Sequence, residues 1–333
     1  MLRALVFAFC FTALSARAQD VAPHAIEIPS WFNQSFLDLR EDVADAAREH
    51  KRVMLYFGQD GCPYCAALMK TNFSQPRIVQ KARKDLVAIA LNIWGDREVT
   101  WFDGKTRSEK EFAAFLKLQF TPTLLFLDER GKVVARLNGY YPPHRFAAVL
   151  DWVGGHMEDA VPLAEYLRTS VKDAASATLH DEPFFMRAPL DLRRGQGAKP
   201  LAVLFETPYC SGCDELHREG FKRREVKAQL AKFDVARISL LDNAKIIAPG
   251  GKSVPASEFA GMLKITYTPS IVFFDPEGRE VFRIEAYLRP FHLAGSFDYV
   301  SSGAYLKQPS FQRFLQTKAE RMRERGEAVE LWK

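Results

Sequence analysis

Two pairs of cysteines are the residues whose type and spacing point most directly to chemistry. The sequence reads CPYC at positions 62–65 and CSGC at positions 210–213. Two cysteines three positions apart at the start of a helix lie on one face, where the unpaired N–H groups and positive helix end favour a thiolate at the first position. We therefore expect Cys62 and Cys210 to attack a substrate disulfide, and Cys65 and Cys213 to resolve the mixed disulfide.

Metal binding is the main alternative use of such pairs. A CxxC can form half of a structural zinc site, but these pairs are 148 positions apart and each follows a predicted strand. Haem attachment is excluded because Ala66 and Asp214 stand where a histidine is required. Copper is a stronger rival, since His217 follows Cys213 by four positions and could share its helix face. Single helical histidines are more often exposed to solvent, as we expect of His217 and His292, so we predict no metal and no dissociable cofactor.

The chain contains an internal repeat. The cysteine motif recurs after 148 positions, and TPT at 121–123 recurs as TPS at 268–270, 147 positions later. The segments that follow, LLFLDERGKVV and IVFFDPEGREV, match in texture, as do FLDLR and PLDLR ahead of the cysteines. Two landmarks with one spacing predict a tandem duplication.

Each copy predicts the same order of strands and helices. A short, nearly continuous apolar run ahead of each cysteine pair indicates a strand buried on both faces. A second strand, a hairpin turned at glycine and a closing helix follow. The first strand, second strand and closing helix are predicted at 52–57, 86–93 and 143–153, and at 201–205, 233–241 and 290–300. The order βαβαββα predicts an α/β fold with helices on both sides of a central sheet.

The chain divides into five predicted segments. They are a signal peptide (1–18), a first unit (27–155), a helical linker (156–180), a second unit (181–304) and a helical tail (305–333). For the tail we expect a solvated helix packed by Phe311, Phe314 and Leu315 rather than a binding element.

The first segment predicts export. Thirteen uncharged residues, 4–16, follow Arg3, and Ala16-Arg17-Ala18 supplies the small residues of a signal peptidase site. The apolar run is shorter than the roughly 20 residues of a membrane-spanning helix, so a retained anchor is the weaker interpretation. We expect a periplasmic protein with no membrane anchor after cleavage.

Composition narrows the classes of protein. Of the 333 residues, 47% are hydrophobic and 26% charged, which excludes a disordered chain and allows a sizeable core. The formal net charge of +5 is spread along the sequence, with no basic stripe for nucleic acid.

Each copy resembles a thioredoxin-fold domain, over most of its length. The resemblance predicts two tandem thioredoxin-like domains, each with a central mixed sheet flanked by helices. It also implies a cis proline facing each cysteine pair, at Thr121-Pro122 and Thr268-Pro269, where the exposed backbone edge would pair with a substrate strand. We count these four residues and Tyr64 among the expected substrate-binding residues.

The first copy is similar, more narrowly, to exported thioredoxins of the SoxW-like, DsbD-associated kind. This similarity implies a membrane electron donor of the DsbD kind. Two departures from thioredoxins stand out. The buried acid that usually precedes the pair by six positions is replaced by Tyr56 and Leu204, and Asp60 and Glu206 are the possible substitutes. Ala286 replaces the glycine at Gly139 of the first copy, which predicts a narrower groove in the second.

We thus predict an exported thiol-disulfide oxidoreductase that exchanges disulfides with protein substrates through both cysteine pairs. The sequence does not fix the direction of electron flow. A reductase fed by a membrane electron donor is our first choice. The alternatives are a disulfide isomerase or oxidase, a periplasmic copper-binding protein, and a chain whose second domain is a redox-silent docking module.

Overall fold

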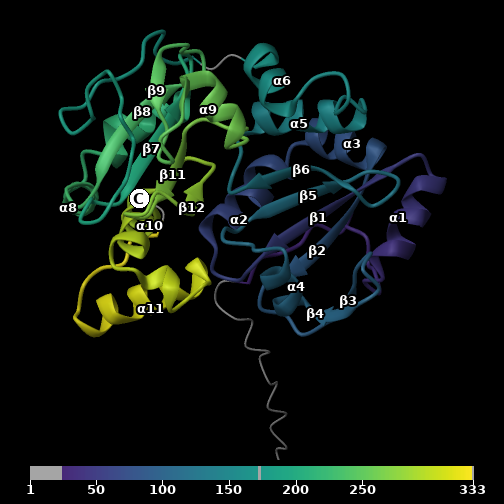
Figure 1. Cartoon of the computed structure of the whole chain (residues 1–333). Helices are drawn as coiled ribbons and strands as arrows, with labels where there is room; N and C mark the ends of the chain where they lie inside the picture. The colour runs from purple at the N-terminus through teal and green to yellow at the C-terminus, as the bar shows by residue number, and fades with distance from the viewer. Residues whose placement is uncertain (1–24, 172–173, 332–333) are drawn as a thin grey trace, which may run out of the picture.

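The computed structural model describes residues 25–171 and 174–331. The predicted signal peptide, residues 1–18, lies outside this part of the chain. Two α/β units follow one another, and a last helix, α11 (Phe311–Glu324), packs below the second unit and extends towards the first (Figure 1). Among the described residues, no helix is both long enough and apolar enough to cross a lipid bilayer.

The first unit is built on a four-stranded sheet of order β2-β1-β5-β6. β1 and β2 are parallel, whereas β5 and β6 are each antiparallel to their neighbour. The strands are β1 (Arg52–Gly58), β2 (Leu86–Asn92), β5 (Thr123–Leu127), β6 (Val133–Asn138) and the small hairpin β3 (Glu98–Thr100) and β4 (Thr106–Ser108). The helices are α1 (Leu39–Arg48), α2 (Pro63–Ala67), the π-helix η1 (Leu68–Asn72), α3 (Pro76–Asp85), α4 (Glu109–Phe115) and α5 (Pro143–Gly154).

The second unit repeats this plan with the sheet order β12-β11-β7-β8. Its strands are β7 (Leu201–Glu206), β8 (Asp234–Ser239), β11 (Ser270–Phe274), β12 (Glu280–Ile284) and the hairpin β9 (Lys245–Ile247) and β10 (Ser253–Pro255). Its helices are α7 (Ser211–Glu215), the π-helix η2 (Leu216–Gly220), α8 (Arg224–Leu230), α9 (Ala256–Met262), α10 (Pro290–Ser301) and the 3₁₀ turn η3 (Ala304–Leu306). The prediction of two tandem units with mixed sheets is confirmed. The two small hairpins were not predicted, because strands of three residues are too short to show a period.

The strand that leads to each cysteine pair is buried on both faces, as its apolar run predicts. In β1, Met54 and Tyr56 point into one hydrophobic core, and Val53, Leu55 and Phe57 into the other. Successive side chains of a strand alternate between the faces of its sheet, so helices must cover both sides. β7 is likewise buried along its whole length. The cysteines therefore follow rigid, fully enclosed strands.

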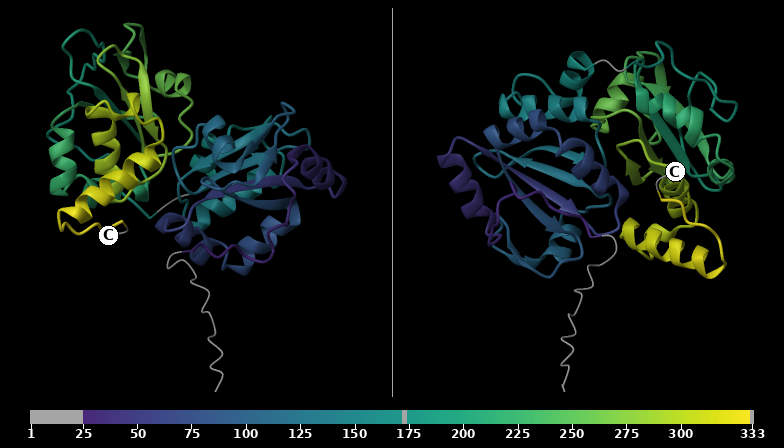
Figure 2. Two further views of the ribbon diagram at one scale, coloured as in Figure 1. Left: turned by 90° about the horizontal axis from the view of Figure 1, so that it is seen from below. Right: turned by 180° about the vertical axis from the view of Figure 1, so that it is seen from behind.

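The two units lie side by side (Figure 2), and aromatic side chains meet where they touch. Tyr141 of the first unit and Tyr267 of the second have ring centroids 4.4 Å apart. Phe120 of the first unit contacts Phe282 and Phe311 of the second part of the chain, at 5.7 and 5.6 Å. One continuous hydrophobic core thus runs through both units.

The linker and the tail differ from their predictions in extent. Of the linker predicted to be helical over 156–180, the described residues form one helix, α6 (Leu163–Ser170), which begins directly after Pro162, a residue that cannot donate a helical hydrogen bond. The tail forms the expected helix, with Ser310 as its N-cap and Phe311 and Leu315 buried. It is not merely a solvated helix, because its N-terminal turn also contacts the first unit.

Candidate active sites

The first cysteine pair lies where β1 turns into α2. Cys62 is the N-cap of α2, and its Sγ accepts a hydrogen bond from the backbone N–H of Cys65 at 3.1 Å. The two residues form a disulfide, with Cα atoms 5.2 Å apart. Pro63 occupies the first turn, where its fixed φ suits a helix start. The expected placement, at the positive end of a helix, is therefore present.

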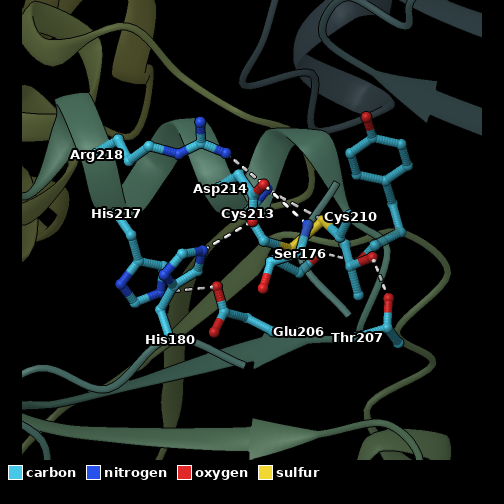
Figure 3. Close-up of a disulfide and its surroundings, with 12 residues drawn as sticks. Ser176, His180, Glu206, Thr207, Cys210, Cys213, Asp214, His217 and Arg218 are labelled. Carbon is cyan, nitrogen blue, oxygen red and sulfur yellow. Dashed lines mark hydrogen bonds and ion pairs between the residues drawn. A yellow bond between two sulfur atoms is a disulfide. The ribbon is translucent and has the colours of Figure 1, made fainter. Parts of the chain in front are cut away.

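The second pair has the same geometry. Cys210 caps α7 and accepts a hydrogen bond from the N–H of Cys213 at 3.1 Å (Figure 3). The pair is also bridged, with a Cα separation of 5.2 Å. Cys62 and Cys210 are only 4% and 2% exposed, although a nucleophile must meet its substrate. This burial was not predicted; beside Cys62, Leu288 and His292 of the second unit help to enclose the site.

A threonine and a cis proline face each pair. The Thr121-Pro122 and Thr268-Pro269 peptide bonds are both cis. The Thr121 hydroxyl donates to Cys62 Sγ at 3.3 Å, and its carbonyl oxygen lies 3.4 Å from the same sulfur. In the second unit, the hydroxyls of Thr207 and Thr268 lie 3.2 Å apart beside the disulfide.

Tyr64, between the first two cysteines, is directed into the second unit rather than towards an open surface. Its hydroxyl accepts a hydrogen bond from the backbone N–H of Arg289 at 2.8 Å and lies 3.5 Å from His292 Nδ1. Burial raises the pKa of Tyr64 and lowers that of His292 to about 4. In this structure the Tyr64 hydroxyl is therefore engaged within the chain, and its contact with substrate stays a prediction.

The two carboxylates considered as substitutes for the usual buried acid differ sharply. Asp60 is exposed and accepts a hydrogen bond from the N–H of Ile26 at 3.1 Å. Glu206, the last residue of β7, is 1% exposed, and its Oε1 lies 3.0 Å from His217 Nε2. Its Oε2 has no hydrogen-bond partner among the described residues. Only the second unit therefore holds a buried carboxylate next to its cysteine motif.

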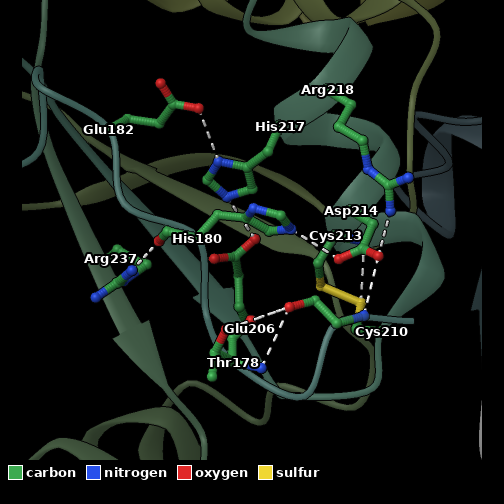
Figure 4. A network of polar contacts seen from close by, with 11 residues as sticks. Thr178, His180, Glu182, Glu206, Cys210, Cys213, Asp214, His217, Arg218 and Arg237 are labelled. Carbon is green, nitrogen blue, oxygen red and sulfur yellow. Dashed lines mark hydrogen bonds and ion pairs between the residues drawn. A yellow bond between two sulfur atoms is a disulfide. The ribbon is translucent and has the colours of Figure 1, made fainter.

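Glu206 belongs to a buried polar network (Figure 4). His217 lies between two carboxylates, since its Nδ1 is 3.1 Å from Glu182 Oε1. Lys222 Nζ in turn donates to both oxygens of Glu182 at 3.0 Å. His217 is 2% exposed, so the expectation of a solvent-exposed histidine is wrong. Its helical spacing did not reveal the two carboxylates, which come from a strand and from a distant loop.

A second branch of the network connects to the cysteine helix itself. His180 stacks on His217 at 4.7 Å, and its Nε2 lies 2.7 Å from Asp214 Oδ1. Burial acts to raise the pKa of Asp214, but hydrogen bonds from His180 and Ser176 and the charge of Arg218 outweigh it and hold that pKa below its ordinary value. Asp214 directly follows Cys213, so the network connects to the C-terminal end of the cysteine motif.

The first unit has no such network at the corresponding positions. Gly58 and Met69 stand where Glu206 and His217 stand in the repeat. An aromatic cluster fills the neighbouring space, with Phe32 and Phe73 centroids 5.5 Å apart. The two sites thus share the geometry of their cysteines, but the side chains that pack behind the cysteines are aromatic in the first unit and polar in the second.

The copper alternative depends on whether His217 has a ring nitrogen available to bind the metal. Both ring nitrogens of His217 lie within hydrogen-bond distance of carboxylates. Within residues 25–171 and 174–331, no group of three or more His, Cys, Asp or Glu side chains is arranged to hold a metal ion.

A cavity of about 350 Å³ lies beside the first pair. Its walls come from three parts of the chain: the cysteine motif with Thr121 and Trp94, the start of α10, and α11. A separate cavity of about 560 Å³ lies beside the second site, against Thr207 and Thr268, and α11 does not line it.

Three solved structures are similar to part of this chain. A thioredoxin from Thermus thermophilus is 25% identical over 35% of this chain and 84% of its own, with a TM-score of 0.28. A thioredoxin-fold protein from Helicobacter pylori is 27% identical over 36% of this chain and 80% of its own, with a TM-score of 0.32. The oxidised DsbD C-terminal domain of Neisseria meningitidis is 18% identical over 34% and 94%, with a TM-score of 0.26.

No curated protein matches the chain. The profile of the thioredoxin-like domain family, however, matches residues 39–154 and again residues 190–301, which together make up more than half of the sequence. The chain therefore belongs to the thioredoxin-like domain family, and it contains that domain twice.

Proposed function

We propose that this protein is an exported thiol-disulfide oxidoreductase that reduces disulfides of other proteins through both cysteine pairs. The observation that carries the proposal is the repeated geometry: each pair is bridged, begins a helix and faces a threonine followed by a cis proline. We assign catalysis to Cys62, Cys65, Cys210 and Cys213. Substrate binding is assigned to Tyr64, Thr121, Pro122, Thr268 and Pro269.

In the proposed reaction the reduced protein is the electron donor. The thiolate of Cys62 or Cys210 attacks one sulfur of the substrate disulfide, so that a mixed disulfide forms and a substrate thiolate leaves and takes a proton. The thiolate of Cys65 or Cys213 then attacks the first cysteine, which releases the second substrate thiol and restores the internal disulfide. Two electrons have passed to the substrate, and a dithiol donor must return them. A membrane protein of the DsbD kind is the proposed donor.

The second cysteine of each pair must lose a proton before it attacks. In the second unit we assign this proton to Glu206, whose buried Oε2 is unpartnered among the described residues. In the first unit the candidate carboxylate, Asp60, is exposed, so we expect the proton of Cys65 to pass to solvent rather than to a buried acid.

Insulin reduction with dithiothreitol as donor tests the activity. We expect the full chain to accelerate it, and each variant that lacks one pair (Cys62→Ser with Cys65→Ser, or Cys210→Ser with Cys213→Ser) to keep part of the rate. No acceleration by the full chain, or an unchanged rate when both pairs are replaced, would contradict the proposal. For export, we expect the mature protein from the periplasm to begin after Ala18.

A further inference from the structure

The tail helix α11 is anchored on the second unit. Phe311, fully buried, lies 4.9 Å from Phe282 between ring centroids, and Leu315 is 5% exposed. Leu315 packs so closely on α10 that a Cβ at Gly295 would lie 2.4 Å from its Cδ2. Lys318 of α11 forms an ion pair with Asp298 of α10. This anchoring fixes where the first turn of α11 lies.

That first turn reaches the active site of the first unit. Gln312 donates to the backbone carbonyl of Gln119 at 2.9 Å and accepts from the Gln59 side chain at 2.8 Å. The same Gln59 amide donates to the hydroxyl of Thr121 at 3.1 Å, and Thr121 contacts Cys62. A short chain of side-chain contacts thus leads from α11 to the reactive sulfur.

Two further contacts strengthen this connection. The Arg313 guanidinium lies 4.4 Å from the centre of the Trp94 ring, a cation–π contact. Gln119 donates to the carbonyl of Pro309 at 3.2 Å and accepts from the N–H of Phe311 at 3.0 Å. The helix is therefore held on the first unit by several hydrogen bonds.

The cavity beside Cys62 is bounded on this side by α11, through Gln312, Leu315, Gln316 and Ala319. Its volume of about 350 Å³ is near the lower end of the range for small-molecule sites, about 300–1,000 Å³. Because Gln312 bonds to Gln119 and to Gln59 beside Thr121, we infer that a protein strand pairing along the backbone of Thr121 would meet α11. A small disulfide needs only the cavity.

We propose that α11 is the third wall of the Cys62 site and determines which disulfides reach it. The inference rests on the proposed function and refines its substrate class. With α11 in place, Cys62 reacts with disulfides of low molecular weight that enter the cavity. A protein strand that pairs along the backbone of Thr121 reaches Cys62 only after α11 leaves the first unit. Gln312, Arg313 and Gln316 are then specificity-determining residues.

The chemistry is the same for both substrates. The Cys62 thiolate bonds to one substrate sulfur while the substrate S–S bond breaks, and the leaving thiolate takes a proton from water. Cys65 then displaces the second thiol and forms the Cys62–Cys65 disulfide. The reduced protein supplies both electrons, so each experiment begins with the protein reduced and freed of reductant.

Single-turnover oxidation of the Cys62–Cys65 dithiol tests the inference in the full chain with Cys210→Ser and Cys213→Ser. The probes are bis(2-hydroxyethyl) disulfide and insulin, and the oxidised fraction is measured by alkylation and mass spectrometry. We call Gln312→Ala with Arg313→Ala, and separately Gln119→Ala, the opened variants, because they remove contacts between α11 and the first unit. Each should raise the rate of oxidation by insulin roughly tenfold, since each lost hydrogen bond weakens the closed form severalfold. With Arg313→Ala or Gln119→Ala, at residues that do not line the cavity, the rate with the small disulfide should change less than about twofold.

Two further variants make the result specific. Gln316→Trp adds bulk inside the cavity and should slow the small disulfide. Arg321→Ala, on an exposed residue of the same helix outside the cavity lining, should change neither rate. The second site is an internal control, tested in the full chain with Cys62→Ser and Cys65→Ser. There the Gln312 and Arg313 changes should not alter the rate at which insulin oxidises the Cys210–Cys213 dithiol, because α11 does not line the cavity beside that site.

The outcomes separate the inference from the proposed function. If insulin oxidises the unmodified Cys62 site as fast as the opened variants, α11 does not set specificity, although the oxidoreductase function stands. If neither probe oxidises the pair in any variant, the proposed function of this site fails. Loss of reactivity with both probes in the opened variants, with normal circular dichroism, would also contradict the role of α11 as a wall.

Discussion

At the scale of residues, the two sites combine equal sulfur geometry with unequal surroundings. In each, the first cysteine caps a helix and receives the N–H of the second at 3.1 Å. Behind the second pair, Glu206 and His217 form a buried polar network, whereas Gly58 and Met69 occupy these positions in the first unit. The internal repeat thus supplies matched controls within one chain.

The proposed role of Glu206 predicts a kinetic defect at the second site. Glu206→Gln keeps the shape of the side chain but cannot accept the Cys213 proton at neutral pH. Because general base catalysis contributes about 10²–10⁴-fold, we expect the mixed disulfide at Cys210 to persist at least tenfold longer. Quenched-flow alkylation with a mixed-disulfide substrate measures this lifetime. Asp60→Asn in the first unit should leave the Cys62 adduct unchanged, and equal lifetimes in wild type and Glu206→Gln would exclude the role.

Removing His217 should destabilise the second unit selectively. His217→Leu leaves Glu182 and Glu206 buried without the ring that lies between them, and breaking such a pair costs about 3–5 kcal/mol. The matched change Met69→Leu replaces one apolar side chain by another and should cost less than about 1.5 kcal/mol. Hydrogen exchange of peptides from β7 and β8 measures the local free energy of opening. Similar losses from both substitutions would show that the network contributes little.

At the scale of elements, the sequence was sufficient to place a strand or helix wherever a periodic run of apolar residues was bounded by proline or glycine. β1 and β7 are buried along their length, and α5 and α10 begin at Pro143 and Pro290, as the patterns predicted. The reactive pairs were identified for the same reason, since type and spacing are local. The network around His217 was missed because Glu182 is 35 positions away and joins it only through tertiary packing. The contact of Gln312 with Gln59 was equally inaccessible, at a separation of 253 positions.

Gly139, which follows β6, shows how one element depends on the other unit. Its φ is +85°, and a Cβ there would lie 3.0 Å from the Cβ of Ala286 in the second unit. Ala286, predicted to narrow its own groove, is therefore part of the contact between the units. Gly139→Ala should lower the free energy of unfolding by about 2–4 kcal/mol, from backbone strain and from overpacking.

A second glycine separates these two effects. Gly104 also has a positive φ, +74°, but nothing lies within 4 Å of its Cβ position. Gly104→Ala should therefore cost only the backbone strain, about 1–2 kcal/mol. Urea unfolding of both variants gives the comparison, and equal losses would mean that the contact with Ala286 is easily relieved.

At the scale of the whole molecule, the two units and α11 enclose the reactive sulfurs together. Tyr64 is held by Arg289 and faces His292, while α11 covers the other side of the Cys62 cavity. Substrate access is consequently a property of the assembled chain rather than of either unit. This arrangement could not be predicted from the sequence, because no periodic pattern of residues indicates how two domains pack against each other.

The enclosure should depend on pH through His292. Burial lowers the pKa of His292 to about 4 from an ordinary value of 6.5, so the closed form binds the proton more weakly than the open form. Closure is therefore fully favoured above about pH 6.5 and weakens as the pH falls towards 4. The neighbouring groups are Tyr64 and Arg289, and Arg289 is paired with Glu215 at 2.7 Å.

Hydrogen exchange of α2 and α11 across this range, corrected for the intrinsic rate, measures the opening. Protection should fall between pH 6.5 and 4.5 in the wild type and change much less in His292→Phe. The same loss of protection in both proteins would assign the effect to other groups, Glu215 foremost.

The central claim is that both cysteine pairs cycle between disulfide and dithiol as an electron-donating protein. Equilibrating the full chain in redox buffers of defined potential, followed by alkylation and mass spectrometry of each pair, tests this claim most directly. We predict a two-electron transition for each pair, at a potential nearer to the value of about −270 mV for thioredoxin than to that of about −120 mV for the oxidant DsbA. Potentials near the latter value would identify an oxidase or isomerase, and a pair that stays in one state throughout would contradict the account for that half of the chain.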